Sequence, residues 1–288
     1  NDLPQWVKNF NDSNITESYF KEWNNLYDIN TYTESGDDLN TYEGGFNGKE
    51  TATFPYNLAS LKDKNGGFNI IAESPYGNSL TSDFAIAAID GEQLGQDDFT
   101  DVLTVSYSST DKVGHNFGPN SKEIEDTYLR LDLDLERLLN ALDEKVGKGE
   151  YTVFLTSDHG APDVPNYLKS IKIPAGLFDE SKMFDELNDF LSSMFDVKNL
   201  VLSRINNQIY FDHKKIEENH LSLEKIKELV SLELLKYDLI DKVYMTSNLN
   251  QFIGAEDYLE VLLRNGHNQK RSGDLLFVYT SGVFKDAE

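Results

Sequence analysis

The fold is decided by two short apolar runs, DVLTVSY at 101–107 and YTVFLT at 151–156, and by the helical pattern between them. Both runs are short, β-branched and followed by polar residues, which is typical of buried strands. Between them apolar residues recur every three or four positions, which predicts an amphipathic helix of about five turns. These positions are Ile124, Tyr128, Leu131, Leu135, Leu138 and Leu142. Because a strand, helix, strand order calls for a right-handed crossover, we predict an α/β fold with a parallel sheet flanked by helices.

Polar residues and glycines mark both ends of this helical pattern. Asn120, with Glu123 three residues later, predicts an N-cap and its capping-box partner. Gly147 and Gly149 end the helix before the second run begins. A further helix is predicted over 81–89, where apolar residues also recur at helical spacing.

Local composition and the predicted secondary structure divide the chain into four parts. Residues 1–60 are rich in Asn, Tyr, Asp and Gly, and predict loops and short helices that cover a larger body. Residues 61–170 are expected to form the central α/β core. Residues 171–250 predict a small α+β insertion, and residues 251–288 are expected to return to the core sheet. The elements expected in the last two parts are helices at about 183–194 and 222–235, and strands at about 200–203, 208–211, 242–245 and 274–279.

Both ends of the sequence resemble the interior of a longer protein. The first residue is Asn1 rather than Met, and the residues that follow it do not form a signal peptide. At the other end, a core-type strand lies close to Glu288. We therefore expect the chain to be an internal fragment, cut either naturally or by expression or proteolysis.

The composition excludes several classes of function. The 288 residues carry 26 Lys and Arg against 50 Asp and Glu, a formal net charge of −24, and no Cys. Such an acidic surface repels phosphate backbones, so nucleic-acid binding is not expected. No apolar stretch approaches the ~18 residues that a membrane span needs. The absence of Cys excludes disulfides, thiolate metal sites and Cys nucleophiles.

Two clusters of metal-binding residue types follow the two predicted strands. Asp111 and His115 come after the first strand, four residues apart, so one helical turn or a tight loop can aim both at one cation. Asp158 and His159 come directly after the second strand, and can meet at one metal only if the chain turns there. Gly160 would permit such a turn. Because open α/β sheets place ligands at the carboxyl ends of their strands, we expect both clusters to lie together at this edge of the sheet.

Each cluster also has a simpler interpretation. An isolated Asp-x-x-x-His is usually a solvated pair or a helix cap, and an isolated Asp-His-Gly is usually a turn. The other histidines, His213, His220 and His267, lie in polar or loop surroundings and are weaker candidates. Asp and neutral His suit Zn²⁺ and also Mn²⁺ or Fe, so ligand type alone does not choose the metal.

Several motifs in the same order resemble the alkaline phosphatase superfamily. They are SYSSTDKVGHNFGPN at 106–120, EDTYLRLD at 125–132, FLTSDHGA at 154–161, SPYGN at 74–78 and KRSGD at 270–274. The best match is the phosphate-irrepressible, monomeric alkaline phosphatase branch, which is related to type I phosphodiesterases and nucleotide pyrophosphatases. The resemblance covers essentially the whole chain and implies an alkaline-phosphatase-like sheet.

The resemblance also implies two zinc ions and a set of site residues. Asp111 and His115 would bind one ion, and Asp158 and His159 the other. The family's Thr nucleophile, a further metal-binding Asp and the residues that hold the phosphate have no counterpart in this chain and are expected upstream of Asn1. A further His ligand is expected downstream. We therefore expect no catalytic nucleophile within these residues, and weak or partial zinc occupancy.

The implied function is phosphomonoester hydrolysis, with a small phosphate ester as substrate. Phosphodiesterase, nucleotide pyrophosphatase and sulfatase activities use the same metal scaffold and remain alternatives. A third alternative is a non-catalytic fragment or binding module that keeps the fold. By the same resemblance, the protein is expected to be a monomer in the periplasm or outside the cell.

Overall fold

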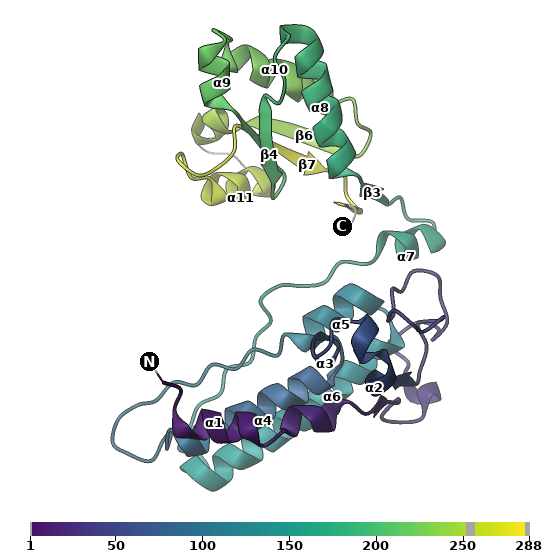
Figure 1. Cartoon of the computed structure of the whole chain (residues 1–288), viewed down its shortest axis with the longest axis vertical. Helices are drawn as coiled ribbons and strands as arrows, with labels where there is room; N and C mark the ends of the chain where they lie inside the picture. Colours follow the sequence, from purple (N-terminus) through teal and green to yellow (C-terminus); the bar gives the residue numbers. More distant parts are fainter. Residues whose placement is uncertain (1, 252–256, 286–288) are drawn as a thin grey trace. The chain divides into compact units, whose positions relative to one another are not determined.

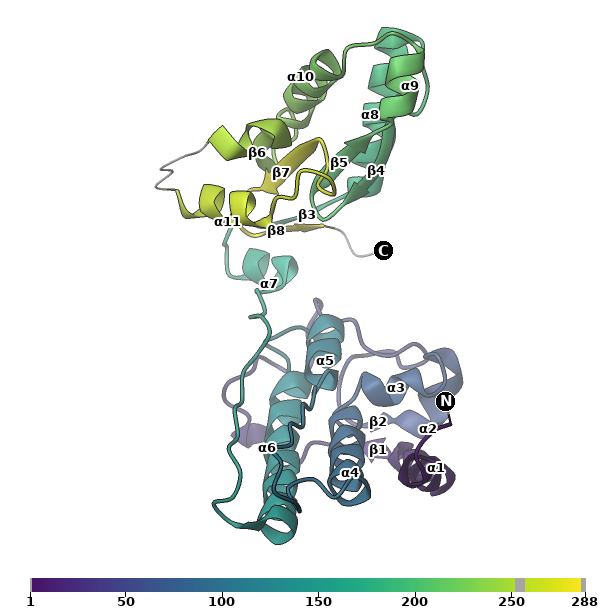
Figure 2. The ribbon, with the colours of Figure 1, turned by 90° about the vertical axis from the view of Figure 1, so that its left-hand side faces the viewer.

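The computed structural model describes residues 2–251 and 257–285, and the chain divides into two compact units, Asn1–Val164 and Pro165–Glu288. Figures 1 and 2 show the elements of each unit. Residues 252–256 and 286–288, which belong to the predicted last part of the chain, lie outside the described residues. None of the described helices has the length and apolar character needed to cross a membrane.

The first unit is mainly helical. Helices α4 and α6 pack side by side, with α1 against α4 and α5 against α6 (Figure 2). Strands β1 and β2 form a short antiparallel pair. The elements are α1 (Gln5–Asp12), β1 (Glu22–Trp23), β2 (Tyr56–Asn57), α2 (Leu58–Leu61), α3 (Asn69–Ala72), α4 (Tyr76–Gly91), α5 (Ser109–Phe117) and α6 (Lys122–Leu142). Short 3-10 turns at Ile15–Tyr19, Ile29–Thr31 and Lys62–Lys64 and a π turn at Asp143–Gly147 complete the unit.

The second unit is an antiparallel sheet with helices packed on it. The four-stranded sheet has the order β4-β5-β7-β6, and β3 pairs in parallel with β8. The elements are α7 (Pro165–Ser170), β3 (Gly176–Phe178), α8 (Glu180–Phe195), β4 (Val201–Ile205), β5 (Gln208–Phe211), α9 (His213–Glu218), α10 (Leu223–Leu234), β6 (Ile240–Met245), a 3-10 turn (Thr246–Gln251), α11 (Tyr258–Gly266), β7 (Leu275–Tyr279) and β8 (Val283–Lys285). The predicted helices and strands of this region are confirmed. The last of them, β7, pairs with β5 and β6 rather than with a strand of the first unit.

The core of the second unit follows from helical periodicity. Helix α8 buries Met183, Leu187 and Leu191, four residues apart, and α10 buries a matching stripe. Both stripes belong to one apolar cluster with the inner face of the sheet. Burying one such side chain stabilises the fold by about 1.5–3 kcal/mol.

The two runs at 101–107 and 151–156 do not form strands in the described chain. Several of their apolar side chains are exposed, including Val102 at 83% and Phe154 at 91%. A strand exists only through hydrogen bonds to a neighbour, and neither run belongs to any of the sheets in the described chain. The prediction of two paired parallel strands at these positions is therefore wrong, whereas the helix between them is confirmed as α6.

The N-terminus of α6 differs from its prediction by one residue. The N-cap is Ser121, whose Oγ accepts a hydrogen bond from the Ile124 amide at 3.1 Å, and not Asn120. Glu123 does not complete a capping box. Its side chain is fully buried and accepts a hydrogen bond from the Tyr56 hydroxyl at 2.5 Å. A buried aromatic partner therefore replaces the local backbone partner that the sequence pattern suggested.

A second acidic residue of α6 ties the helix to the N-terminal segment. The buried carboxylate of Asp126 accepts hydrogen bonds from Trp23 Nε1 at 2.7 Å, from the Leu26 amide at 2.7 Å and from the Tyr32 hydroxyl at 2.5 Å. Arg130, one turn later, forms an ion pair with it at 2.6 Å. Asp126 is thus fully satisfied, and its removal would leave several buried donors without a partner.

Glu123 lacks such compensation and makes the stability of the first unit depend on pH. Its Oε2 atom is buried without a hydrogen-bond partner, and so are one oxygen of Glu43 and one of Asp38. Burial raises the pKa of Glu123 to about 8, the Tyr56 hydrogen bond lowers it, and the charge of Glu43 raises it further. In the same region, burial raises the pKa of Glu43 to about 7.

These pKa shifts predict a loss of stability as the pH rises. A carboxyl whose folded-state pKa lies above its unfolded value stabilises the fold fully below about pH 4.5, and this contribution is lost as the pH approaches 8. One proton contributes at most about 1.4 kcal/mol per pH unit. Glu123→Gln, which mimics the neutral acid, should flatten the decline between pH 5 and pH 8 in urea unfolding followed by Trp fluorescence. Identical slopes in the variant and the wild type would contradict the assignment.

Candidate metal centre

Helix α5 presents the first predicted pair of ligands on one exposed side. His115 Nε2 lies 3.4 Å from Asp111 Oδ1, as expected for positions four apart on a helix. The opposite side of α5 is fixed in the core by Val113 and Phe117, both fully buried. Gly77 allows α4 to approach closely, because a Cβ there would lie 2.1 Å from Ser109 Oγ. The helix is therefore a rigid support for two solvent-accessible ligands.

The second pair lies where the chain bends after the run at 151–156. Asp158 Oδ1 accepts a hydrogen bond from the His159 amide at 3.0 Å, and His159 Nδ1 lies 3.0 Å from the Gly160 carbonyl oxygen. These contacts orient the imidazole so that its Nε2 lies 3.7 Å from Asp158 Oδ2. The turn needed to bring two adjacent side chains together is present.

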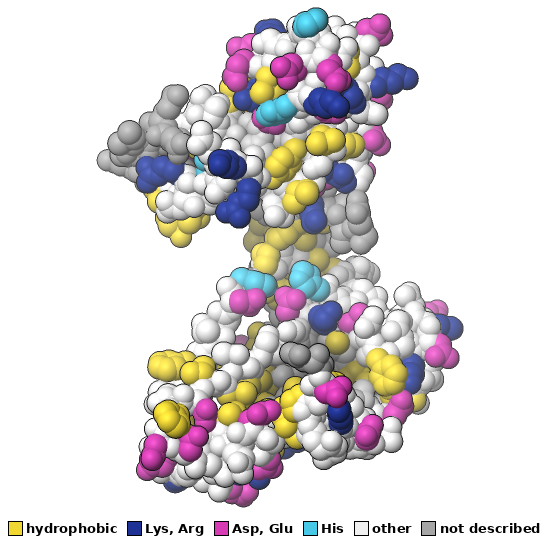
Figure 3. Space-filling view, turned by 60° about the vertical axis from the view of Figure 1, so that its left-hand side comes forward, with side chains coloured by type: hydrophobic (Ala, Val, Ile, Leu, Met, Phe, Trp, Pro, Cys, Tyr) yellow, Lys and Arg dark blue, Asp and Glu magenta, His cyan; other side chains and the backbone are white. Residues whose placement is uncertain are grey.

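The two pairs meet in space. His159 Nε2 lies 3.8 Å from Asp111 Oδ1, although the two residues belong to different segments of the first unit. In Figure 3, histidine and acidic side chains gather together on the surface of this unit. The prediction that the clusters share one place is confirmed, but they do so without the parallel strands that were expected to position them.

The electrostatics of the cluster favour a cation. The hydrogen bond to the Gly160 carbonyl, and then the charges of Asp158 and Asp111, raise the pKa of the His159 imidazole. The neighbouring carboxylates thus favour a positive charge on this imidazole, as they would favour a cation beside it. Two carboxylates and two imidazoles are also a chemically suitable donor set for zinc.

The four residues do not make a complete metal site. Among the residues that the structure describes, no three His, Cys, Asp or Glu side chains are arranged so that they could hold a metal ion together. The assignment of Asp111, His115, Asp158 and His159 as ligands stays a prediction. Each pair supplies two donors, fewer than the three or four protein ligands of ordinary zinc sites.

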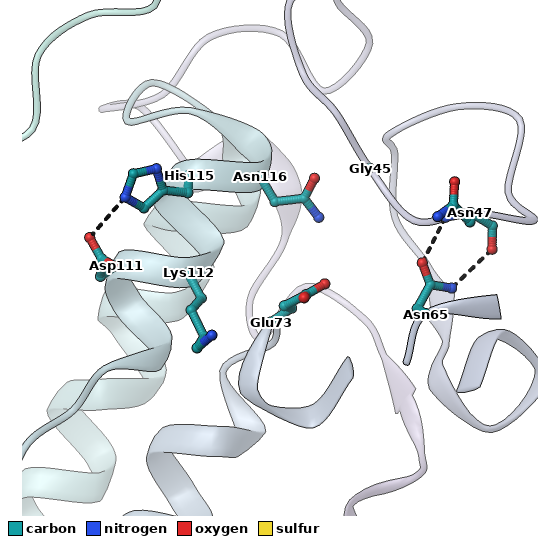
Figure 4. A pocket seen from close by; sticks show the side chains of 8 residues that line it. All are labelled: Gly45, Asn47, Asn65, Glu73, Asp111, Lys112, His115 and Asn116. Carbon is teal, nitrogen blue, oxygen red and sulfur yellow. Dashed lines mark hydrogen bonds and ion pairs between the residues drawn. The ribbon is translucent and has the colours of Figure 1, made fainter. Parts of the chain in front are cut away.

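A cavity of about 520 Å³ opens beside the Asp111–His115 pair (Figure 4). It is lined by residues of α5, of the α3–α4 junction and of the loops around 45 and 65: Gly45, Asn47, Asn65, Glu73, Asp111, Lys112, His115 and Asn116. Sequence reasoning missed Asn47 and Glu73, because Asn47 lies in no motif and Glu73 directly precedes the SPYGN motif at 74–78 without being part of it. Lys112 and Asn116 lie in the motif at 106–120 that also contains Asp111 and His115, and this position was the only indication in the sequence that they belong to a site.

Comparison with known proteins establishes the family. The type I phosphodiesterase / nucleotide pyrophosphatase family matches residues 5–285, so the chain belongs to this family. The alkaline phosphatase PafA of Elizabethkingia meningoseptica is 43% identical over 282 residues, which are 98% of this chain and 51% of that protein. The alkaline phosphatase PhoV of Synechococcus elongatus is 43% identical over 284 residues, which are 98% of this chain and 50% of that protein.

The fold is that of a solved relative. The crystal structure of wild type alkaline phosphatase PafA matches with a TM-score of 0.92 and 42% identity, covering 99% of this chain and 54% of that chain. The predicted alkaline-phosphatase-like α/β fold is thereby confirmed. This chain spans about half the length of these relatives.

Proposed function

We propose that this chain supplies part of the metal centre of a zinc-dependent phosphomonoester hydrolase. The observation that carries the proposal is the approach of His159 Nε2 to Asp111 Oδ1 at 3.8 Å, which joins two pairs of metal-binding residue types from separate segments. Hydrolases of this superfamily, among them alkaline phosphatases, are the relatives over nearly the whole chain.

In this proposal Asp111 and His115 hold one ion, and Asp158 and His159 hold the other. A pair of metal ions supplies stabilisation of the attacking and leaving oxygens of a phosphoryl group and offsets its negative charge. The ions would also make an anionic substrate acceptable to a chain with a net charge of −24. The proposal assigns the Thr nucleophile and the remaining ligands, which the resemblance implies, to residues outside this chain.

Diester cleavage is the second candidate. The matching family is described as type I phosphodiesterase / nucleotide pyrophosphatase. The resemblance implies that both reactions use the same metal scaffold. Sulfate-ester hydrolysis and a purely non-catalytic role are further possibilities that the same experiment addresses. We also propose, from the resemblance alone, a monomer that is exported and acts on small phosphate esters.

The deciding experiment uses a protein that extends this chain to the length of its relatives. Zinc-dependent hydrolysis of p-nitrophenyl phosphate that exceeds hydrolysis of bis-p-nitrophenyl phosphate and p-nitrophenyl sulfate is the expected result. Faster cleavage of the diester or the sulfate would keep the superfamily and overturn the proposed substrate. No zinc-dependent hydrolysis of any of the three would favour the non-catalytic role.

The 288-residue chain by itself is expected to bind zinc weakly and to be inactive. Two donors per ion leave most coordination positions to water, so isothermal titration should show affinity well below that of ordinary zinc sites. Hydrolysis of p-nitrophenyl phosphate should not exceed that of free zinc. Two tight sites in this chain would show that the missing ligands are not needed.

A further inference from the structure

We propose that the cavity beside α5 binds the alcohol part of the substrate and that this part is a polyhydroxylated group, such as a sugar or glycerol. The inference rests on the proposed phosphomonoesterase function and names its substrate class. Asp111 and His115 line the cavity, so a group bound there lies directly beside the candidate metal centre (Figure 4).

The wall of the cavity is polar and has unused hydrogen-bonding capacity. The side chains of Asn47, Glu73, Lys112 and Asn116 line it, and none of them forms a hydrogen bond or ion pair within the described part of the chain. No apolar side chain contributes to the lining. The wall therefore offers amide donors and acceptors, a carboxylate and an ammonium group.

This set of groups suits several hydroxyls better than an aromatic or acyl group. Each hydroxyl donates one hydrogen bond and accepts up to two, so it needs partners of both kinds. The amides of Asn47 and Asn116 provide both, Glu73 accepts, and Lys112 donates. Glu73 and Lys112 carry opposite charges, so these two side chains together do not favour either sign of charge on the alcohol. An apolar leaving group would desolvate these side chains without replacing their hydrogen bonds with water.

The cavity is held in place by contacts that its lining residues make behind the wall. The Asn65 side chain accepts a hydrogen bond from the Asn47 backbone N–H at 2.8 Å, and it donates one to the Asn47 backbone carbonyl oxygen at 2.9 Å. The Gly44 amide donates to the Asn116 carbonyl oxygen at 2.8 Å, which joins the loop to α5. A Cβ at Gly44 would lie 2.7 Å from the Asn116 backbone carbonyl oxygen, so this approach requires glycine. Such preformed walls reduce the cost of ordering on binding.

The test compares the hydrolysis of different phosphate esters by the zinc-loaded protein, extended to the length of its relatives. We expect Glu73→Ala and Asn47→Ala each to lower the ratio of kcat/KM for glucose 6-phosphate to kcat/KM for phenyl phosphate by about tenfold or more, mainly through KM. Glycerol 2-phosphate, measured in parallel, distinguishes a sugar site from a site for a small polyol. Asp63→Asn, an exposed residue outside the cavity, is the matched control and should leave the ratio unchanged.

Three outcomes separate this proposal from the proposed function. Hydrolysis of phenyl phosphate with ratios that neither variant changes would overturn the polyol site and leave the phosphomonoesterase function standing. Failure to hydrolyse any monoester would overturn both. If a variant does not fold, competitive inhibition of the wild type by free glycerol or glucose supports the site, and its absence at high concentration contradicts it.

Discussion

Asp111→Ala, made in a protein that extends this chain to the length of its relatives, is expected to lower kcat/KM for p-nitrophenyl phosphate by roughly 10³-fold or more. The Asp111 carboxylate lies close to both imidazoles, since its Oδ1 lies 3.4 Å from His115 Nε2 and 3.8 Å from His159 Nε2. Its loss would remove a proposed ligand of one ion and a negative charge beside the proposed ligand of the other. Metal ions and nucleophile act as a unit, so removing one part forfeits most of what the others supply.

His159→Ala should produce a loss of similar size, accompanied by a lower zinc content after dialysis. Matched controls are available for both variants. Asp132 is an exposed carboxylate on α6, and Asp132→Ala should keep full activity. His220 is an exposed histidine with a positive φ of 54° that Asn tolerates, so His220→Asn is the control for His159→Ala. Full activity of the Asp111 and His159 variants would overturn the metal-site assignment itself.

The regular elements of the second unit could be predicted from the sequence because their signals are local. The buried stripes of α8 and α10 and the alternation in β5 require no knowledge of the rest of the fold. The runs at 101–107 and 151–156 have an equally strong β pattern, yet they form no strand. β propensity shows that a run can adopt an extended conformation, whereas a strand also needs an adjacent strand with which to form hydrogen bonds.

The candidate site was predicted better than the elements that position it. Adjacent motifs after two similar runs suggested that Asp111 and His159 meet, and they do. The predicted cause, a shared sheet edge, is not present in the described residues. In its place, α5 presents one pair and a bend after residue 157 presents the other. The cavity could not be predicted, because its wall combines side chains from segments without a common pattern.

Buried charges were the largest gap between sequence and structure. Glu123 was predicted to be a capping-box partner and Asp126 had no predicted structural role, and both are fully buried. Their burial depends on aromatic side chains from distant segments, Tyr56 for Glu123 and Trp23 for Asp126. Asp126 belongs to the EDTYLRLD motif at 125–132, so part of what the family resemblance recognises is a structural anchor and not a ligand.

Asp126→Ala is therefore expected to destabilise the first unit by about 3–5 kcal/mol, the usual cost of breaking a buried charged network by removing one partner. The change would leave Trp23 Nε1 and the Tyr32 hydroxyl without their acceptor and Arg130 without its ion pair. Asp126→Asn keeps one acceptor oxygen but replaces the other with an amide donor, so it should have an intermediate effect.

Urea unfolding followed by Trp fluorescence measures this effect in the first unit alone, because both tryptophans of the chain, Trp6 and Trp23, lie there. Asp132→Ala, an exposed position on the same helix, should change the free energy of unfolding by no more than about 0.5 kcal/mol. If Asp126→Ala lowers the free energy of unfolding by less than about 1 kcal/mol, other contacts must anchor the N-terminal segment. Removing a buried carboxylate that has four hydrogen-bonding partners costs more than this if those contacts form in solution.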